Sequence, residues 1–297
     1  MKKLSVYFCY LILMTNCASK TTNGTPVIPV VIVPVAEKTF TTDSCGVNQD
    51  EAMLSKDGWK KVWAEDFSSN LDGWKIWNGG AYNNEYQLYQ AGNLSLKDGV
   101  LKITPYRELV SGAEVPLSTK SKTFDFTSGR LETKINFTPN GGTNYSMIRF
   151  SARVKTPKGL GLWPAFWAYG DNWPTNGEID VIESDGNTPK KYSTNYFYGN
   201  EINKPLTKST VITINSDTDL TSCWQVYEVI WEKDQLTFFL NGKQVSQNKG
   251  NFVPDMYSKK QNIVLNLAVG GDYVGNPAKN TIQLAPMYAD WVRVYTK

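Results

Sequence analysis

The sequence predicts an all-β protein in which two antiparallel sheets are stacked as a sandwich. From Trp59 onward the apolar residues recur at period two or in short runs, and Gly, Asn, Asp and Pro interrupt them at short intervals. No segment carries an apolar stripe at helical spacing over three turns. The dipeptide Asn241-Gly242, between two such runs, is typical of a tight hairpin that joins antiparallel strands. We therefore expect one sandwich domain over residues 59–297.

The composition excludes several functional classes. The chain has 31 basic and 28 acidic residues, so its net charge of +3 indicates neither nucleic acid nor a membrane surface as a partner. It contains no histidine, which removes the commonest general base and metal ligand and every Ser-His or Cys-His arrangement. Chemistry must then use carboxylates, Lys, Tyr or Cys. The 10 Trp and 16 Tyr suit sugar faces, although packing within sheets explains such rings equally well.

Residues 1–17 are typical of an export signal. Two lysines precede an apolar run from Leu4 to Met14, which is shorter than the roughly 20 residues that span a bilayer. The run ends at Cys17 and resembles a bacterial lipoprotein signal, which implies lipidation of Cys17 and a place on the cell surface or in the periplasm. Asn16 departs from that signal, and ordinary cleavage or a retained anchor are the alternatives.

Residues 18–58 are predicted to be a tether. Pro26, Pro29 and Pro34 prevent a continuous helix or a central strand. The apolar part, VIPVVIVPV, could instead lie as an edge strand on the domain. Once the signal is removed, Cys45 and Cys223 are the remaining cysteines beside Cys17, and they either pair in an oxidising compartment or stay as two free thiols.

The predicted strands follow one another through the domain. They are KVWAEDF, GVLKITPY, GRLETKINF, MIRFSARVKT, GEIDVIES, WQVYEVIWE, QLTFFLNGKQV, NIVLNLAVGG and ADWVRVYTK.

The stretch GEIDVIES holds three carboxylates among β-branched residues. On a strand, Glu178 and Asp180 share a face, but strict alternation turns Glu183 to the other side. One bulged residue among Val181, Ile182 and Glu183 would return Glu183 to the first face. The two glutamates would then lie roughly 13 Å apart at Cα, from which long side chains converge to the about 5 to 5.5 Å of a retaining glycosidase.

Clustered acids on one face favour chemistry over structure, because like charges along a strand repel. Their repulsion becomes useful where one acid must keep a proton while another stays ionised. A calcium site is the competing interpretation, but calcium loops prefer irregular backbone rich in Gly, Asn and Asp.

Beyond this motif, nearly all of residues 59–297 resembles glycoside hydrolase family 16, in particular its laminarinase-like members. The stretch RFSARVKTPKGLGLWPAFWAYGDNWPTNGEIDVIE is similar to that family's strand, tryptophan-rich segment and catalytic strand in order. VWAEDF, NNEYQLYQ and FTSGRLETK resemble its early strands, and LNLAVGG and MYADWVRVY its last ones.

This resemblance implies a β-jelly-roll with a concave cleft and a retaining double displacement. Glu178 would be the nucleophile, Glu183 the acid/base, and Asp180 a hydrogen-bonding partner of the nucleophile. It implies no cofactor for catalysis, a polysaccharide as substrate, and a monomer that meets the membrane only through its lipid. Core packing is the alternative for Trp163 and Trp167, and a hydrogen bond between strands is the alternative for Asn83 and Arg149. Six positions resemble sugar-contacting residues of the family: Trp163, Trp167, Trp173, Asn83, Arg149 and Asn195.

The sequence departs from the laminarinases at three places. Where they carry a histidine after the acid/base, this chain has KYSTNYFYGN, and Thr194-Asn195 looks more like lichenases and xyloglucan enzymes. Tyr273 stands where laminarinases often have tryptophan, and TPNGGTNYS is an insertion. Asp66 and Asp290 match the acids of a structural calcium site in some family members.

Three functions are compatible with these observations. The first is an exported endo-β-1,3- or mixed-linkage β-1,3(4)-glucanase. The second is a hydrolase of algal galactans such as agarose, porphyran or carrageenan. The third is a non-catalytic glucan-binding protein on the same fold, which the presence of both glutamates disfavours. A net transglycosylase would share the covalent intermediate of the first.

Overall fold

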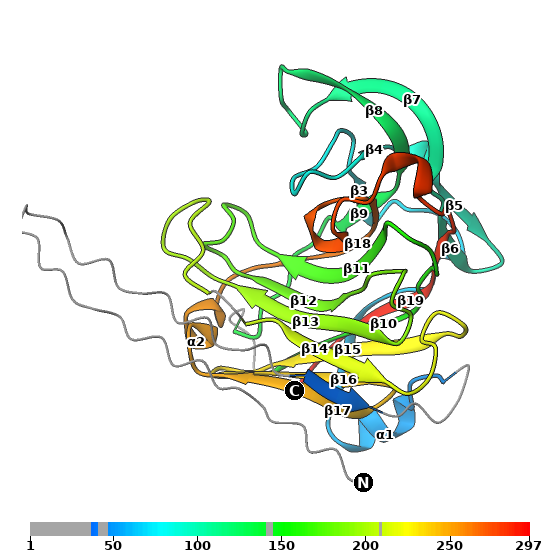
Figure 1. Cartoon of the computed structure of the whole chain (residues 1–297). Coiled ribbons are helices and arrows are strands. Elements are labelled where there is room, and N and C mark those ends of the chain that lie inside the picture. Colours follow the sequence, from blue (N-terminus) through cyan, green and yellow to red (C-terminus); the bar gives the residue numbers. More distant parts are fainter. Residues whose placement is uncertain (1–36, 41–46, 141–144, 208–209) are drawn as a thin grey trace, which may run out of the picture. The chain divides into compact units, whose positions relative to one another are not determined.

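Two large sheets organise the chain, of which the computed structural model describes residues 37–40, 47–140, 145–207 and 210–297 (Figure 1). The first sheet has the strand order β1 (Glu37–Phe40), β14 (Ile212–Ser216), β13 (Lys191–Phe197), β12 (Glu178–Glu183), β11 (Leu162–Tyr169), β18 (Asn262–Val269), β9 (Arg130–Thr133) and β3 (Trp74–Ile76). The second has the order β17 (Lys243–Lys249), β16 (Gln235–Leu240), β15 (Gln225–Trp231), β10 (Ile148–Lys155), β19 (Met287–Thr296), β6 (Val100–Ile103) and β5 (Leu94–Lys97), and β2 (Lys60–Glu65) also pairs with β19.

A third, small sheet consists of β4 (Gln87–Tyr89), β8 (Ser121–Ser128) and β7 (Tyr106–Ala113). All strand pairs are antiparallel except β1 with β14 and β4 with β8. The predicted sandwich of two stacked antiparallel sheets is confirmed, whereas the small sheet was not predicted. The remaining elements are the helices α1 (Glu51–Lys56) and α2 (Val253–Met256) and the 3-10 turns Ala91–Asn93, Asp272–Val274 and Lys279–Thr281.

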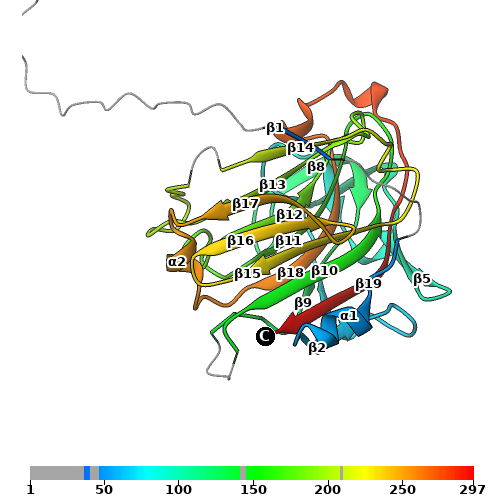
Figure 2. The same ribbon diagram turned by 90° about the horizontal axis from the view of Figure 1, so that it is seen from below.

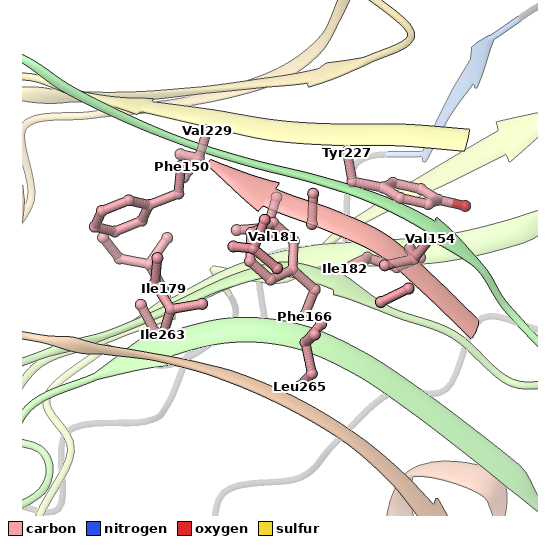
Figure 3. Packing of buried hydrophobic residues seen from close by; sticks show 14 of the residues in the cluster. Phe150, Val154, Phe166, Ile179, Val181, Ile182, Tyr227, Val229, Ile263 and Leu265 are labelled. Carbon is pink, nitrogen blue, oxygen red and sulfur yellow. The ribbon is translucent and has the colours of Figure 1, made fainter. Parts of the chain in front are cut away.

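The core lies between the two large sheets and is built by period-two alternation. Phe166 of β11 and Ile179 of β12 point from the first sheet toward Phe150 and Val229 of the second (Figure 3). Each of these four side chains is fully buried. Burying one such side chain contributes about 1.5–3 kcal/mol, so the alternation that the sequence displays is also what holds the layers together.

The hairpin between β16 and β17 turns at Asn241 and Gly242, as predicted. Their φ angles are 52° and 76°, the left-handed pair that a tight hairpin turn requires. Asn241 also ties the turn to β15, because its Oδ1 accepts from the Val226 N–H at 2.8 Å.

The domain begins earlier than residue 59, which corrects the predicted end of the tether. Helix α1, capped by Asp50, buries Leu54 against Trp59 and Tyr295. Figure 2 shows α1 beside β2 and β19. Upstream, β1 pairs with the edge strand β14, while the apolar segment 27–35 lies outside the described residues. Residues 47–58, which composition assigned to the tether, therefore belong to the folded domain.

Within the described part of the chain, neither helix has the length and apolar character needed to cross a bilayer.

Candidate active site on the first sheet

Strand β12 carries the bulge that the carboxylate spacing requires. Asp180 faces Asn195 of β13 and Glu183 faces Ser193, so three steps along β12 match two along β13. The same extra residue appears against β11, where Trp167 pairs with Asp180 and the preceding Phe166 pairs with Ile182. The predicted bulge is therefore confirmed, and Val181 is the residue skipped by β11.

The bulge divides the six residues of β12 between two faces. Ile179, Val181 and Ile182 are all within the hydrophobic core (Figure 3). The three acids, Glu178, Asp180 and Glu183, lie on the opposite side of the first sheet, which we call the carboxylate face. Glu178 and Glu183 are half-buried there, whereas Asp180 between them is buried.

Burial raises the pKa values of all three acids, and repulsion between them adds to this effect at Asp180 and Glu183. Burial raises the pKa of Glu178 to about 7, and the neighbouring Trp173, Asp180 and Arg130 keep it from rising further. Burial, together with the charge of Glu178, raises the pKa of Glu183 to about 8. Asp180 has its pKa raised well above the usual range, first by burial and then by the two glutamates. Asp180 therefore keeps its proton, and its hydrogen bond to Glu178 favours the ionised form of that glutamate.

Trp163 holds the carboxyl of Glu183. Its Nε1 donates to Glu183 Oε1 at 3.1 Å. Its ring stacks on Tyr273 with centroids 4.9 Å apart, and the Tyr273 hydroxyl donates to the Glu183 carbonyl at 2.9 Å. Trp163 is thus a partner of the acid rather than part of the core between the sheets.

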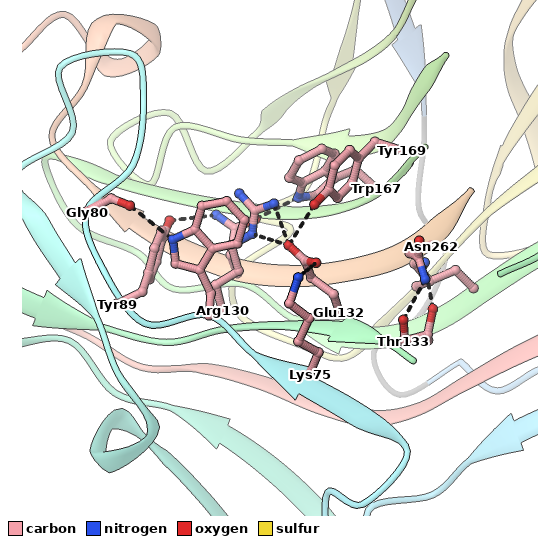
Figure 4. A network of polar contacts seen from close by, with 12 residues as sticks. Lys75, Gly80, Tyr89, Arg130, Glu132, Thr133, Trp167, Tyr169 and Asn262 are labelled. Carbon is pink, nitrogen blue, oxygen red and sulfur yellow. Dashed lines mark hydrogen bonds and ion pairs between the residues drawn. The ribbon is translucent and has the colours of Figure 1, made fainter. Parts of the chain in front are cut away.

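Trp167, on the same face, belongs to a network around Arg130. Its Nε1 donates to Asn266 Oδ1 at 2.7 Å. The Arg130 guanidinium lies 4.8 Å from the Trp167 ring centroid and pairs with Glu132 at 2.8 Å (Figure 4). Tyr169 donates to the same Glu132 at 3.0 Å. The network brings one buried cation close enough to Glu178 to lower its pKa.

Trp173 and Asn195 lie next to the acids, and Asn83 lies near Trp163. Trp173 follows β11, packs against Phe197 at 5.9 Å and lies beside Glu178. Asn195 faces Asp180 across β13, and its Oδ1 accepts from Thr210. Asn83 is exposed, and its carbonyl accepts from the Asp272 N–H at 2.9 Å in the loop that carries Tyr273. The structure thus brings five of the six predicted sugar contacts to this side of the first sheet.

Arg149 is the exception, and its predicted role in sugar binding is wrong. It lies on β10 in the second sheet, where its guanidinium pairs with Glu228 at 2.7 Å. Phe150 points into the core, so Arg149 points away from it and from the first sheet. Alternation along β10 indicates which side chains share a face, but it does not indicate that the strand belongs to the second sheet.

The two acids predicted for calcium both have other partners in this structure. Asp290 is already paired with Arg153 at 2.6 Å, and the Asp66 side chain accepts from the Ser68 N–H. Across the described ranges no group of three or more His, Cys, Asp or Glu side chains is placed to hold a metal. Calcium binding stays a prediction, which thermal unfolding with and without a chelator would test.

Cys223 is disulfide-bonded. Cys9, Cys17 and Cys45 lie outside the described residues, so the predicted pairing of Cys45 with Cys223 and the lipidation of Cys17 stay predictions.

Sequence reasoning missed the polar residues that surround the three acids. Arg130 and Glu132 occupy alternate positions of β9, and both are buried. Glu85 is buried too; it accepts from Gln87 at 2.6 Å, and its charge contributes to the raised pKa of Glu183. Asn266 interrupts the apolar run of β18. The available signal was a charged or amide residue at period two within strands that otherwise look buried.

These features define a class of protein: a β-sandwich with a three-carboxylate site on the outer face of one sheet. The family model of Glycosyl hydrolases family 16 matches residues 77–293, so the chain belongs to that family. The resemblance predicted from the sequence is thereby confirmed.

Curated relatives include β-glucanases and a clotting factor. The glucan endo-1,3-beta-glucosidase of Cryptopygus antarcticus is 29% identical, over 76% of this chain and 90% of the relative. The clotting factor G alpha subunit of Tachypleus tridentatus is 28% identical, over 80% of this chain. The chain spans only 34% of the length of that subunit and 39% of the glucan endo-1,3-beta-glucosidase A1 of Niallia circulans.

Two solved structures are similar to this chain in both fold and sequence. The endo-beta-1,3-glucanase from Pyrococcus furiosus has a TM-score of 0.67 and 29% identity, covering 80% of this chain and 94% of that one. A structure from work on endo-acting O-glycanases, which human gut microbiota express to initiate mucin breakdown, has a TM-score of 0.66 and 26% identity, covering 80% and 91%.

Proposed function

We propose that the protein is an endo-acting, retaining glycoside hydrolase that cleaves β-1,3- or mixed-linkage β-1,3(4)-glucan. One observation carries the proposal: the bulge in β12 puts Glu178 and Glu183 on one face with unequal proton affinities. Family membership and the β-glucanases among the relatives support the choice of substrate.

In the first step, an oxygen of the Glu178 carboxylate attacks the anomeric carbon of the bound sugar. The bond from that carbon to the glycosidic oxygen breaks, and the leaving oxygen takes the proton of Glu183. Asp180, itself protonated, donates to Glu178 and keeps it ionised before attack. The product is a glycosyl ester on Glu178.

In the second step, Glu183, now ionised, removes a proton from water as the water attacks the anomeric carbon. The ester bond breaks and Glu178 leaves as carboxylate, so the configuration of the sugar is retained. Loss of charge on Glu178 in the ester lowers the pKa of Glu183, because that charge was one cause of its elevation. Esterification of Glu178 thus favours the change of Glu183 from acid to base.

The sugar chain would lie across the carboxylate face. Trp167 and Trp173 offer ring surface on that side, and Asn195 supplies an amide beside Asp180. Asn83, near Trp163, would contact a sugar farther from the cleaved bond.

The test is release of reducing sugar by the purified protein from laminarin, barley β-glucan, lichenan, agarose, porphyran and carrageenan. Release from laminarin or a mixed-linkage glucan is the expected result. Release from a galactan alone would keep the mechanism and change the substrate. Binding of glucan without release from any polysaccharide would indicate a binding protein.

Mucin O-glycans form a second candidate substrate. The histidine of the laminarinases is replaced here by the Ser193–Asn195 segment of β13, and a similar structure comes from work on mucin O-glycanases. Mucin therefore joins the panel, and release of oligosaccharides from it, with none from laminarin, would move the proposal to that substrate.

We further propose that the chain is exported as a monomer and lipidated at Cys17, and that Cys45 pairs with Cys223. The sequence of residues 1–17 and the disulfide at Cys223 support this. Incorporation of a labelled fatty acid that Cys17→Ala abolishes would test the lipid. Peptide mapping without reduction would identify the partner of Cys223, and light scattering would measure the oligomeric state.

A further inference from the structure

Tyr273 is connected to the acid/base by two separate routes. The first runs through Trp163, whose Nε1 donates to Glu183 Oε1 at 3.1 Å. The Trp163 ring stacks on Tyr273 with centroids 4.9 Å apart and an interplanar angle of 18°. The direction of the indole N–H, and hence the place of the Glu183 carboxyl, depends on that ring contact.

The backbone at Gly271 lies so close to the Trp163 ring that it leaves little room for a side chain. A Cβ at Gly271 would lie 3.2 Å from Trp163 Cζ3 and 3.1 Å from Glu85 Cγ, and φ at Gly271 is 98°. Only glycine lets the backbone pass this close in that conformation. The segment that carries Tyr273 is therefore fitted against Trp163 at two neighbouring positions.

The second route runs through the main chain of Glu183. The Tyr273 hydroxyl donates to the Glu183 carbonyl at 2.9 Å and lies 3.2 Å from Ser193 Oγ. Ser193 is the residue that faces Glu183 across β13, on the far side of the bulge. The hydroxyl thus binds β12 at the point where the strand returns to regular pairing.

We propose that Tyr273 is a positioning residue for the acid/base Glu183, assisted by Ser193. Its ring fixes the indole that holds the carboxyl, and its hydroxyl fixes the backbone from which that carboxyl extends. Phenylalanine would supply the ring contact without the hydroxyl, so the second route is specific to a residue with both. This inference rests on the proposed function, because it assumes that Glu183 protonates the leaving group.

The experiment compares the wild-type protein with Tyr273→Phe on a series of aryl β-laminaribiosides whose leaving groups differ in pKa. If the acid is displaced, the rate falls for basic leaving groups, which need the proton, and changes little for acidic ones, which do not. We expect the rate on the most basic phenol to fall about tenfold, a small part of the roughly 10²–10⁴ that a general acid supplies. The rate on dinitrophenyl laminaribioside should change less than twofold, so the dependence on leaving-group pKa steepens.

Tyr257→Phe is the matched control. Tyr257 is also half-buried, and its hydroxyl also donates to a main-chain carbonyl at 2.9 Å, that of Ser146. This variant should leave the leaving-group dependence unchanged. Equal rate losses on all leaving groups in Tyr273→Phe would indicate a merely structural role, and a higher KM at unchanged dependence would indicate a sugar contact. Either result would overturn the proposal.

A second readout does not depend on the substrate. In protein labelled with ¹³C at the glutamate carboxyls, the Glu183 resonance, assigned with Glu183→Gln, should shift or broaden in Tyr273→Phe and not in Tyr257→Phe. An unaltered resonance would overturn the proposal. Wild-type protein that is inactive on every β-glucoside, with this resonance altered as expected, would instead count against the proposed function alone.

Discussion

The outer faces of the two large sheets both contain buried acids, but the acids have different neighbours. On the second sheet, Glu228 accepts from Arg149 and from Ser151 at 2.6 Å, and Gln49 of the N-terminal segment covers it. On the carboxylate face, Glu178 and Glu183 flank a third acid, Asp180, whose Oδ2 has no hydrogen-bond partner. A buried acid that is neutralised by a cation holds structure together, whereas acids packed against acids keep protons at neutral pH. Glu228 therefore belongs to a structural ion pair, whereas the three acids of the carboxylate face hold the protons that acid/base chemistry requires.

The largest expected effect is at Glu178, the proposed nucleophile. Glu178→Ser should lower kcat on laminarin on the order of 10⁴-fold or more, because the covalent intermediate cannot form. Glucan binding and the melting temperature should be retained. Glu201→Gln, at a glutamate whose side chain is 66% exposed, is the control and should keep full activity. A loss of less than tenfold in Glu178→Ser would exclude it as nucleophile.

Breaking the ion pair on the second sheet should affect stability instead. Arg149→Met leaves Glu228 buried without its cation, so the free energy of unfolding should fall by about 3–5 kcal/mol, measured in urea. Lys204→Ala, which breaks the exposed pair with Glu201, should cost less than about 1 kcal/mol.

A double variant tests whether Arg149 acts through its ion pair with Glu228 or in catalysis. Arg149→Met combined with Glu228→Leu should regain much of the lost stability, since neither charge is then buried alone. The kcat of folded Arg149→Met should equal that of wild type. A fall in kcat at unchanged stability would contradict our placement of Arg149 outside the active site.

The pH dependence of kcat/KM should form a narrow bell with its optimum between pH 7 and 8. Below about pH 7 Glu178 takes up a proton and loses its nucleophilic charge, and above about pH 8 Glu183 loses the proton that it must donate. Each limb should approach a tenfold change per pH unit. A flat profile from pH 5 to 9 on a soluble glucan would contradict this assignment.

The last prediction concerns the dependence of stability on pH. The pKa of Glu183 is about 8 in the folded protein against an ordinary value of 4.5. The contribution of Glu183 to the free energy of unfolding is therefore complete below pH 4.5 and is lost as pH rises through 8. Glu183→Gln should therefore melt at a higher temperature than wild type at pH 8.5 and at the same temperature at pH 4. Glu201→Gln should show no such change, and an identical shift at both pH values in Glu183→Gln would disprove the linkage.

The active-site strand could be predicted because its information is local. Three acids at fixed spacing, among β-branched residues, required one bulge to share a face, and β12 has it at Val181. The same holds for the common face of Trp163 and Trp167, whereas their place beside the acids was implied by the family resemblance. No knowledge of neighbouring strands was needed for these predictions.

The remaining site residues could not be assigned from the sequence. Arg130 and Glu85 lie far along the chain from β12, and long-range strand pairing and loop placement bring them to the acids. Tyr273 looked like a replaced tryptophan, and nothing local indicated that its hydroxyl reaches the Glu183 carbonyl.

The sequence by itself determined the β-sandwich, the bulged strand and which side chains of each strand share a face, because period two is a property of the extended backbone. Only the tertiary structure decided which sheet each strand joins. Arg149 alternates with core residues as regularly as Glu178 does, but its strand pairs within the second sheet, so its charge stabilises that sheet instead of serving the carboxylate face. Strand order depends on contacts between distant segments, and the alternation within a strand carries no record of them.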